Sequence, residues 1–186
     1  MDMDVRRVMN TCLQCWQHAT SGPRSFPMRA LPRGWPGEVV AMYMFGPLTE
    51  TTRGATIILV LIDHFTRWVE LTALRKVEVT DVVSCLRDRW VPQHGVPAAL
   101  LSDNGPQFVA TVLRDFCVSM GIKKLDSTPY YPKGSSIVES FMRTLRKALA
   151  ALVNEEGNNW DTYLSVVALA HNSTPHMSTG FFRPSF

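Results

Sequence analysis

Two carboxylate residues, Asp103 and Glu139, stand at places where a protein can do chemistry. Asp103 follows the apolar run AALLS and starts an Asp-Asn-Gly turn, and Glu139 lies in the helical pattern of residues 135–157. Functional sites in open α/β sheets gather at strand ends and at the loops that lead into helices. The pair is separated by 139 − 103 − 1 = 35 residues. Asp103 is therefore a candidate functional group, with Glu139 as its candidate partner.

Glu139 shares one face of its predicted helix with three basic residues. At a step of about 100° per residue, Arg143 falls near 40° from Glu139, Arg146 near −20° and Lys147 near 80°. These bases can contact phosphates. They can equally form an ordinary solvated face, with a Glu139–Arg143 ion pair of a few tenths of a kcal/mol. The opposite face, which we expect to bury against a sheet, carries Ile137, Phe141, Leu145, Ala148 and Leu152.

Strand formers dominate the first half of the main domain, which begins near Trp35. Two apolar runs separated by the turn-like GPLTETTRG predict a hairpin, and a third strand follows. Helical spacing of Val79, Val82, Val83 and Leu86 then predicts a helix that ends at Gly95. The predicted strands cover residues 37–45, 55–65 and 66–74, and the helix covers 78–95.

The second half alternates strands and helices. A short apolar strand leads to Asp103, and a single helix over 107–121 is expected to carry Phe108, Val112 and Phe116 on one side. A strand and loop over 122–132 precede the long helix. The order βββαβαβα predicts a mixed sheet flanked by helices.

The composition excludes some classes of protein. The chain has 186 residues, 46% of them hydrophobic, and a net charge of +3, which permits a nucleic-acid partner without requiring one. Its longest apolar run, GATIILVLI, is far shorter than the roughly 20 residues of a membrane-spanning helix. The amino terminus lacks the apolar region of a secretory signal. We expect no membrane association and a nuclear or cytoplasmic location.

The motifs around the two carboxylates carry a family resemblance. SDNGPQF, STPYYP and HNSTPHMSTG occur in that order, with GPLTETTRGATIILVLIDHFTRWVEL before them. Together they resemble the integrase catalytic core of retroviruses and gypsy-type long-terminal-repeat retrotransposons. The resemblance covers nearly the whole chain and implies a DDE-type, ribonuclease H-like fold with a mixed five-stranded sheet. It also implies an ancestral role in DNA integration.

The resemblance further implies a metal site with a missing ligand. In that family three carboxylates bind two Mg²⁺ or Mn²⁺ ions about 4 Å apart, which activate water or a DNA 3′-hydroxyl for attack on a phosphodiester. Asp103 and Glu139 match the second and third carboxylates, but Tyr43 occupies the first position. A neutral phenol is a poor Mg²⁺ ligand. We therefore expect weak or no metal binding and impaired catalysis.

Two other acids, Asp63 and Glu70, are candidate replacements for the first carboxylate. If the hairpin closes around residues 47–55, Asp63 faces the start of the first strand, several residues from Tyr43, and Glu70 belongs to the third strand. Neither is expected to reach the site.

Basic residues remain near the site for phosphate contacts, and the candidates for DNA binding are Lys133, Arg143, Arg146 and Lys147.

The amino-terminal residues 1–34 resemble a truncated zinc-binding module with its linker, ahead of the core-like domain of residues 35–186. Cys12 and Cys15 supply two of the four ligands that a structural Zn²⁺ site needs, so a Zn²⁺ site is doubtful. Two free thiols are the simpler interpretation. The last residues, GFFRPSF, stop where the family continues into a further region. We expect both ends of the domain to be clipped.

Three functions stay open from the sequence. The first is a DNA-binding integrase core, a pseudoenzyme with little or no catalysis. The second is an active polynucleotidyl transferase or nuclease that uses a replacement ligand. The third is a non-catalytic module for oligomerisation, such as a homodimer formed through the core. The bases beside the former site favour the first.

Overall fold

The computed structural model describes residues 34–126 and 132–174, and for residues 132–136 it describes the backbone alone. The predicted zinc ligands Cys12 and Cys15 lie outside the described residues, as does the side chain of Lys133. None of the helices in this described part is both long enough and apolar enough to cross a membrane.

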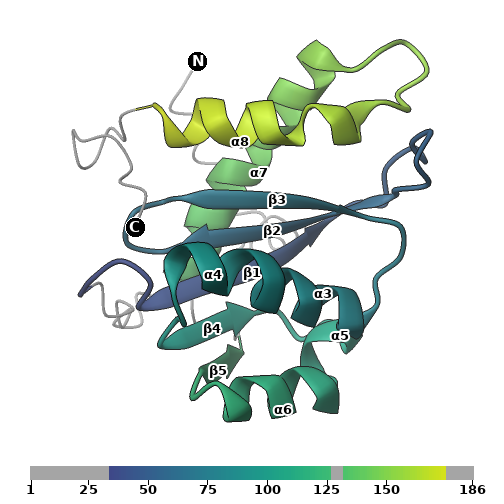
Figure 1. Ribbon diagram of the computed structural model, residues 1–186. Helices are drawn as coiled ribbons and strands as arrows, with labels where there is room; N and C mark the ends of the chain where they lie inside the picture. The colour runs from purple at the N-terminus through teal and green to yellow at the C-terminus, as the bar shows by residue number, and fades with distance from the viewer. Residues whose placement is uncertain (1–33, 127–131, 175–186) are drawn as a thin grey trace, which may run out of the picture.

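A five-stranded mixed sheet forms the centre of the fold, in the order β3-β2-β1-β4-β5 (Figure 1). The strands β1 and β2 form the predicted antiparallel hairpin, and β3 extends it, while β4 and β5 run parallel to β1. This arrangement confirms the mixed sheet that the element order predicted and the ribonuclease H-like fold that the resemblance implied. The strands are β1 (Val39–Phe45), β2 (Ile57–Asp63), β3 (Val69–Leu74), β4 (Ala99–Ser102) and β5 (Lys123–Asp126).

Helices cover both faces of the sheet (Figure 1). The predicted helix over 78–95 consists of α3 (Val79–Cys85), a π-helical segment η1 (Leu86–Trp90) and α4 (Val91–His94), and it ends at Gly95, which has φ 78°. The remaining helices are α5 (Pro106–Val109), α6 (Thr111–Ser119), α7 (Pro132–Leu152), the short 3₁₀ turn η2 (Trp160–Thr162) and α8 (Leu164–Asn172).

Alternate residues of β1 face the two halves of the core. Val39 and Ala41 pack with α7 and α8, whereas Val40 and Met42 pack with α3, α5 and α6. All four side chains are buried, since successive residues of a strand point to opposite faces of its sheet. A central strand buried on both faces is held firmly in register, because a slip by one residue would exchange its two faces.

The buried face of α7 differs in phase from the predicted one. Phe141 and Leu145 are buried as expected, but the stripe continues through Val138 and Leu149. Leu152, which we expected to be buried, is 40% exposed. Val153, the next residue, packs against the core in its place, so Leu152 lies outside the buried stripe because of the helical phase.

The single helix predicted over 107–121 is interrupted. Ala110 has φ −62° and ψ 143°, an extended conformation that ends α5 and starts α6. This break shifts the helical phase, so Phe108, Leu113 and Cys117 are buried, and Val112, predicted to share the face of Phe108, is 49% exposed. The prediction of one continuous helix was wrong at this point.

Two leucines of α7 test the observed phase of the helix. Replacing Leu145, which is fully buried, with Ala should lower the free energy of unfolding by about 2 to 5 kcal/mol, because the substitution leaves a cavity. The matched variant Leu152→Ala should cost far less. Urea unfolding followed by circular dichroism measures both values, and equal costs would contradict the packing described for α7.

Candidate functional site

Tyr43, within β1, and Asp103, directly after the end of β4, lie beside each other on two neighbouring strands. The parallel register pairs Met42 of β1 with Ser102 of β4, so the next residue along each strand is Tyr43 and Asp103. Tyr43 is half-buried and packs with the part of the core that α7 covers. By the alternation of side chains along β4, Asp103 belongs to that same face.

Glu139 reaches this end of the sheet from α7. It directly follows Val138, whose buried side chain anchors that turn of the helix in the core, and it is itself exposed. The pKa of the Tyr43 phenol is raised above its ordinary value, first by burial and then by the negative charges of Asp103 and Glu139. The structure thus brings the tyrosine and both predicted carboxylates into one electrostatic site.

Hydrogen bonds fix the turn that carries Asp103. The backbone N–H of Gly105 donates to Asp103 Oδ1 at 2.9 Å, and Ser102 Oγ donates to the backbone oxygen of Asp103 at 2.8 Å. Lys124 Nζ in turn donates to Ser102 Oγ at 2.8 Å and to Asp126 Oδ1 at 2.9 Å. Lys124 therefore holds the turn from the neighbouring strand.

The sequence reasoning missed this supporting role of Lys124. It is mostly buried, with 12% of its side chain exposed. Its position opposite Leu100 in the parallel ladder of β4 and β5 places it next to the strand that ends in Asp103. The only sequence signal was a lysine inside a strand, which by itself does not indicate a partner.

The side chains at this site do not fit the pair of ions that the resemblance implies. In the part of the chain that the structure describes, no three His, Cys, Asp or Glu side chains lie close enough together to hold a metal ion. Tyr43 is the third group beside them; a phenol is neutral at neutral pH, and burial with the two carboxylates raises its pKa further. Hard divalent cations prefer charged carboxylate oxygens. Asp103 and Glu139 remain as two ligands.

Asp63 does not replace the first carboxylate. It is fully buried, and it faces Val40 across the hairpin whereas Tyr43 faces Val60, as the sequence predicted. Its Oδ2 accepts hydrogen bonds from the backbone N–H and the hydroxyl of Thr66, at 2.7 and 2.6 Å, and its Oδ1 accepts from a backbone N–H at 3.1 Å. Asp63 is thus committed to the turn after β2.

Glu70 is also committed elsewhere. It lies in β3, two strands away from β1, opposite Leu61 of β2. Its Oε1 is 2.6 Å from His94 Nε2, and the ring of His94 packs between Trp68 and Trp90 at centroid distances of 5.7 and 4.5 Å. Neither candidate replacement ligand, Asp63 or Glu70, belongs to the site.

The predicted basic face of α7 is present. Arg143, Arg146 and Lys147 are exposed, and the Arg146 guanidinium lies over the ring of Phe45, 5.7 Å from its centroid. None of the three bases has an ion pair with another described residue, so the Glu139–Arg143 pair of the alternative interpretation does not form. The three positive charges are free to contact an anionic partner.

Comparison with known proteins agrees with this architecture. Residues 38–132 match the family described as "Integrase core domain". The chain is 34% identical over 175 residues to the Gag-Pol polyprotein of koala retrovirus, a match that covers 92% of the chain and 10% of the polyprotein. The chain thus spans a small part of such relatives.

Solved structures give the same result. The catalytic core domain of BIV integrase matches with a TM-score of 0.63 and 25% identity, covering 75% of this chain and 86% of that one. The HTLV-2 integrase catalytic core domain, a trimeric form in complex with magnesium, matches with a TM-score of 0.64 and 18% identity, covering 80% and 94%. At that identity the second match shows the fold alone.

The pKa of Tyr43 tests whether the two carboxylates face the phenol. Asp103→Asn and Glu139→Gln should each lower this pKa, because removing a negative charge makes the phenolate easier to form. It should stay above its ordinary value, since burial is the largest cause of the shift. NMR titration of ¹³C-labelled tyrosine, assigned with Tyr43→Phe, measures it. Asp115→Asn on α6 is the control and should leave the pKa unchanged.

Proposed function

Because this chain belongs to the integrase core domain family, we propose that it binds DNA through α7 and has lost the two-ion strand-transfer chemistry associated with integrases. One observation carries the proposal: Tyr43 stands in the second half of β1, beside Asp103 and within the field of Glu139. The resemblance places a carboxylate at that position.

The residue at position 43 decides the chemistry, because a carboxylate there would be charged whereas the tyrosine is neutral. Bound Mg²⁺ or Mn²⁺ would supply an activated oxygen nucleophile and would stabilise the charge of the leaving oxygen. Tyr43 instead places a neutral, half-buried ring between the strands and α7, and the two carboxylates beside it raise its pKa further. Ionisation of the phenol at neutral pH is thus disfavoured, and Asp103 and Glu139 have no third charged oxygen beside them.

DNA binding follows from the charges that remain. Arg143, Arg146 and Lys147 project from successive turns of one helix and have no ion pair with other described residues. Lysine and arginine side chains that neutralise phosphates release counterions, which gives sequence-independent affinity. Arg143 and Arg146 flank the helical face on which Glu139 lies, so bound DNA would pass close to the former catalytic centre.

The hypothesis of an active enzyme needs a third metal ligand that the described residues do not supply. It requires a replacement carboxylate, and both candidates are held by other groups, Asp63 by the turn after β2 and Glu70 by His94. No described third acid lies with Asp103 and Glu139. A pure oligomerisation module would leave the unpaired bases of α7 without a role, so DNA binding accounts for more of the surface.

Restoring the missing carboxylate tests the loss of catalysis. The natural chain should show no Mn²⁺-dependent nicking or strand transfer on a labelled DNA duplex, and Tyr43→Asp should gain at least a ten-fold signal over it, because the scaffold keeps the other two carboxylates in place. Tyr43→Asp combined with Glu139→Gln should lose the gained activity. Gel analysis of the labelled strands gives both readouts.

Activity of the natural chain that Glu139→Gln abolishes would overturn this part of the proposal. It would mean that another group completes the site. Inactivity of Tyr43→Asp with unchanged DNA binding would show that position 43 is not the decisive difference.

The salt dependence of binding tests the DNA partner separately. The affinity for a fluorescent duplex should fall steeply with salt, and Arg143→Ala and Arg146→Ala should each reduce the slope of log K against log salt by about one, because each removes one phosphate contact. Arg114→Ala, an exposed arginine of α6, is the matched control and should change the slope little. Fluorescence anisotropy between low and physiological salt gives these slopes. No binding at low salt would leave oligomerisation as the better account.

A further inference from the structure

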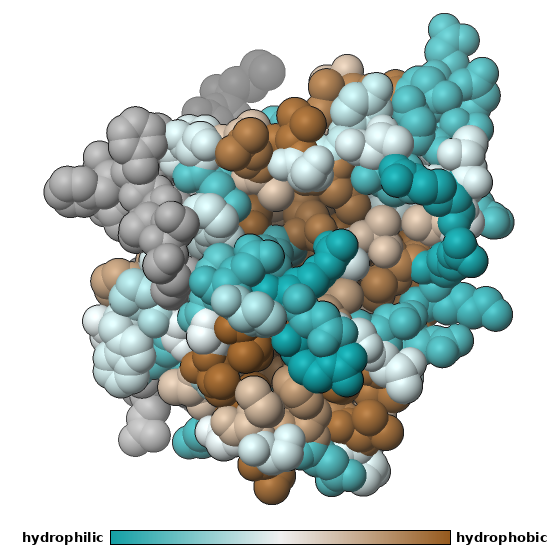
Figure 2. Space-filling view, in the orientation of Figure 1, coloured by the Kyte–Doolittle hydropathy of each residue, from teal (hydrophilic) through white to brown (hydrophobic). Residues whose placement is uncertain are grey.

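An apolar cavity lies between the loop after β1 and the second half of α7. Its volume is about 250 Å³, and its apolar walls come from Phe45, Leu48, Leu149, Ala150 and Trp160. The face over α3 and α8, in contrast, mixes hydrophilic and apolar side chains (Figure 2). Pockets for drug-sized ligands measure roughly 300 to 1,000 Å³. A cavity of this smaller size fits a single flat ring system.

Hydrogen bonds hold the walls of this cavity in place. The indole Nε1 of Trp160, a buried residue, donates to the backbone oxygen of Thr49 at 2.7 Å. The backbone N–H of Thr52 donates to the backbone oxygen of Asn158 at 3.1 Å. The loop after β1 is thus tied to the segment that follows α7. A ligand would enter a site whose walls are already ordered, which lowers the cost of binding.

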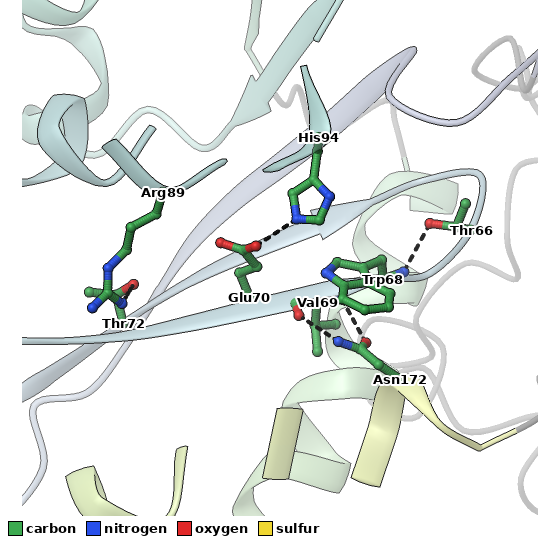
Figure 3. A network of polar contacts seen from close by, with 8 residues as sticks. All are labelled: Thr66, Trp68, Val69, Glu70, Thr72, Arg89, His94 and Asn172. Atoms are coloured by element: carbon green, nitrogen blue, oxygen red, sulfur yellow. Dashed lines mark hydrogen bonds and ion pairs between the residues drawn. The ribbon is translucent and has the colours of Figure 1, made fainter. Parts of the chain in front are cut away.

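A single cation borders the cavity. Of the described residues that line it, Arg146 alone is charged, and its guanidinium lies over the ring of Phe45, 5.7 Å from the centroid. Arg146 has no ion pair or hydrogen bond with another described residue. Arg89, by comparison, already donates from Nη1 to the Thr72 hydroxyl at 3.1 Å (Figure 3). The donors of Arg146 are therefore available to an anionic group beside the cavity.

The cavity adjoins the former catalytic centre. Phe45 follows Tyr43 by two residues on β1, so both side chains lie on the face of the sheet that α7 covers. Arg146 follows Glu139 by two turns of α7, about 10 Å along the helix. In Figure 1 this helix runs behind the strands. A DNA strand that contacts the bases of α7 would therefore pass the cavity.

We propose that this cavity binds one unpaired base of a DNA strand that lies along α7. The base stacks on the ring of Phe45, and Arg146 contacts the phosphate next to it. Every base has an aromatic face, and apolar walls offer no pattern of hydrogen-bonding groups, so the site accepts bases of any sequence. The inference rests on the proposed DNA binding by α7 and adds to it a preference for DNA with unpaired bases.

The charges around the cavity favour DNA over a partner protein. An aromatic side chain of a protein would fit the walls, but it brings no negative charge to Arg146. Arg143 and Lys147 lie within one turn of Arg146 and are exposed. A row of positive charges matches a row of phosphates. In a fully paired duplex the bases stay stacked inside the helix, so a base can enter the cavity only where it is unpaired.

A gapped duplex tests the inference. The probe is a fluorescein-labelled duplex with an internal single-stranded gap of about five nucleotides, and the same duplex without a gap is the comparison. The full chain should bind the gapped duplex at least about five-fold more tightly at equal salt, the gain expected from stacking one base. Ala150→Leu, which fills the cavity from an exposed position, should abolish this preference and leave the affinity for the paired duplex unchanged.

Two further measurements keep the test specific. Ala151→Leu, at the next exposed alanine of α7 and outside the cavity lining, should keep the preference for the gapped duplex. A 2-aminopurine base in the gap should lose fluorescence when the chain binds, because stacking on an aromatic ring quenches it. Phe45→Leu, which removes the ring but keeps an apolar side chain, should abolish this quenching.

Several outcomes would overturn the inference. Equal affinities of the unaltered chain for gapped and paired duplexes would remove the unpaired base and leave DNA binding by α7 standing. Absence of binding to either duplex at low salt would overturn both proposals. A preference that Ala150→Leu keeps, or that both alanine variants lose equally, would place the base outside the cavity. Binding of a labelled peptide of alternating Asp and Phe that Ala150→Leu abolishes, with both DNA affinities unchanged, would assign the cavity to a protein partner.

Discussion

The parallel pairing of β1 with β4 is the constraint on which the rest of the structure depends. It joins strands from distant parts of the sequence and brings Tyr43 and Asp103 to one end of the sheet. The pairing is fixed because β1 is buried on both faces, so a shift by one residue would turn Val40 and Met42 into the wrong half of the core. α7 packs across the same face and adds Glu139. The geometry of the site is thus a consequence of the core.

A sheet whose register is fixed by its core can keep its fold when a catalytic residue is replaced. Tyr43 packs against the core in the phase of Val39 and Ala41, so an aromatic ring is tolerated at the position where the resemblance places a charged carboxylate. Its burial and its two acidic neighbours all favour the neutral phenol. The exposed bases of α7 do not depend on the residue at position 43, so the proposed DNA binding does not require catalysis.

Most of the fold could be predicted from sequence, because local patterns carried it. Runs of strand formers around a turn-like segment predicted the hairpin, and the Asp-Asn-Gly turn marked the strand end before Asp103, whereas Tyr43 was singled out only by the family resemblance. The sequence could not show what depends on contacts between distant residues. The break at Ala110 has no Gly or Pro to mark it, so the helical phase after it was wrong. The amide of Asn172 on β3 and the bond from Lys124 to Ser102 likewise join residues far apart in the chain.

The number of Mn²⁺ ions bound by the chain tests the central claim most directly, because it is independent of DNA and of turnover. Electron paramagnetic resonance titration of free Mn²⁺ should give at most one weakly bound ion for the natural chain and two for Tyr43→Asp, since only the variant offers three carboxylates at this end of the sheet. Two tightly bound ions in the natural chain, lost together in Asp103→Asn, would contradict the account and show that the site is complete with a tyrosine in it.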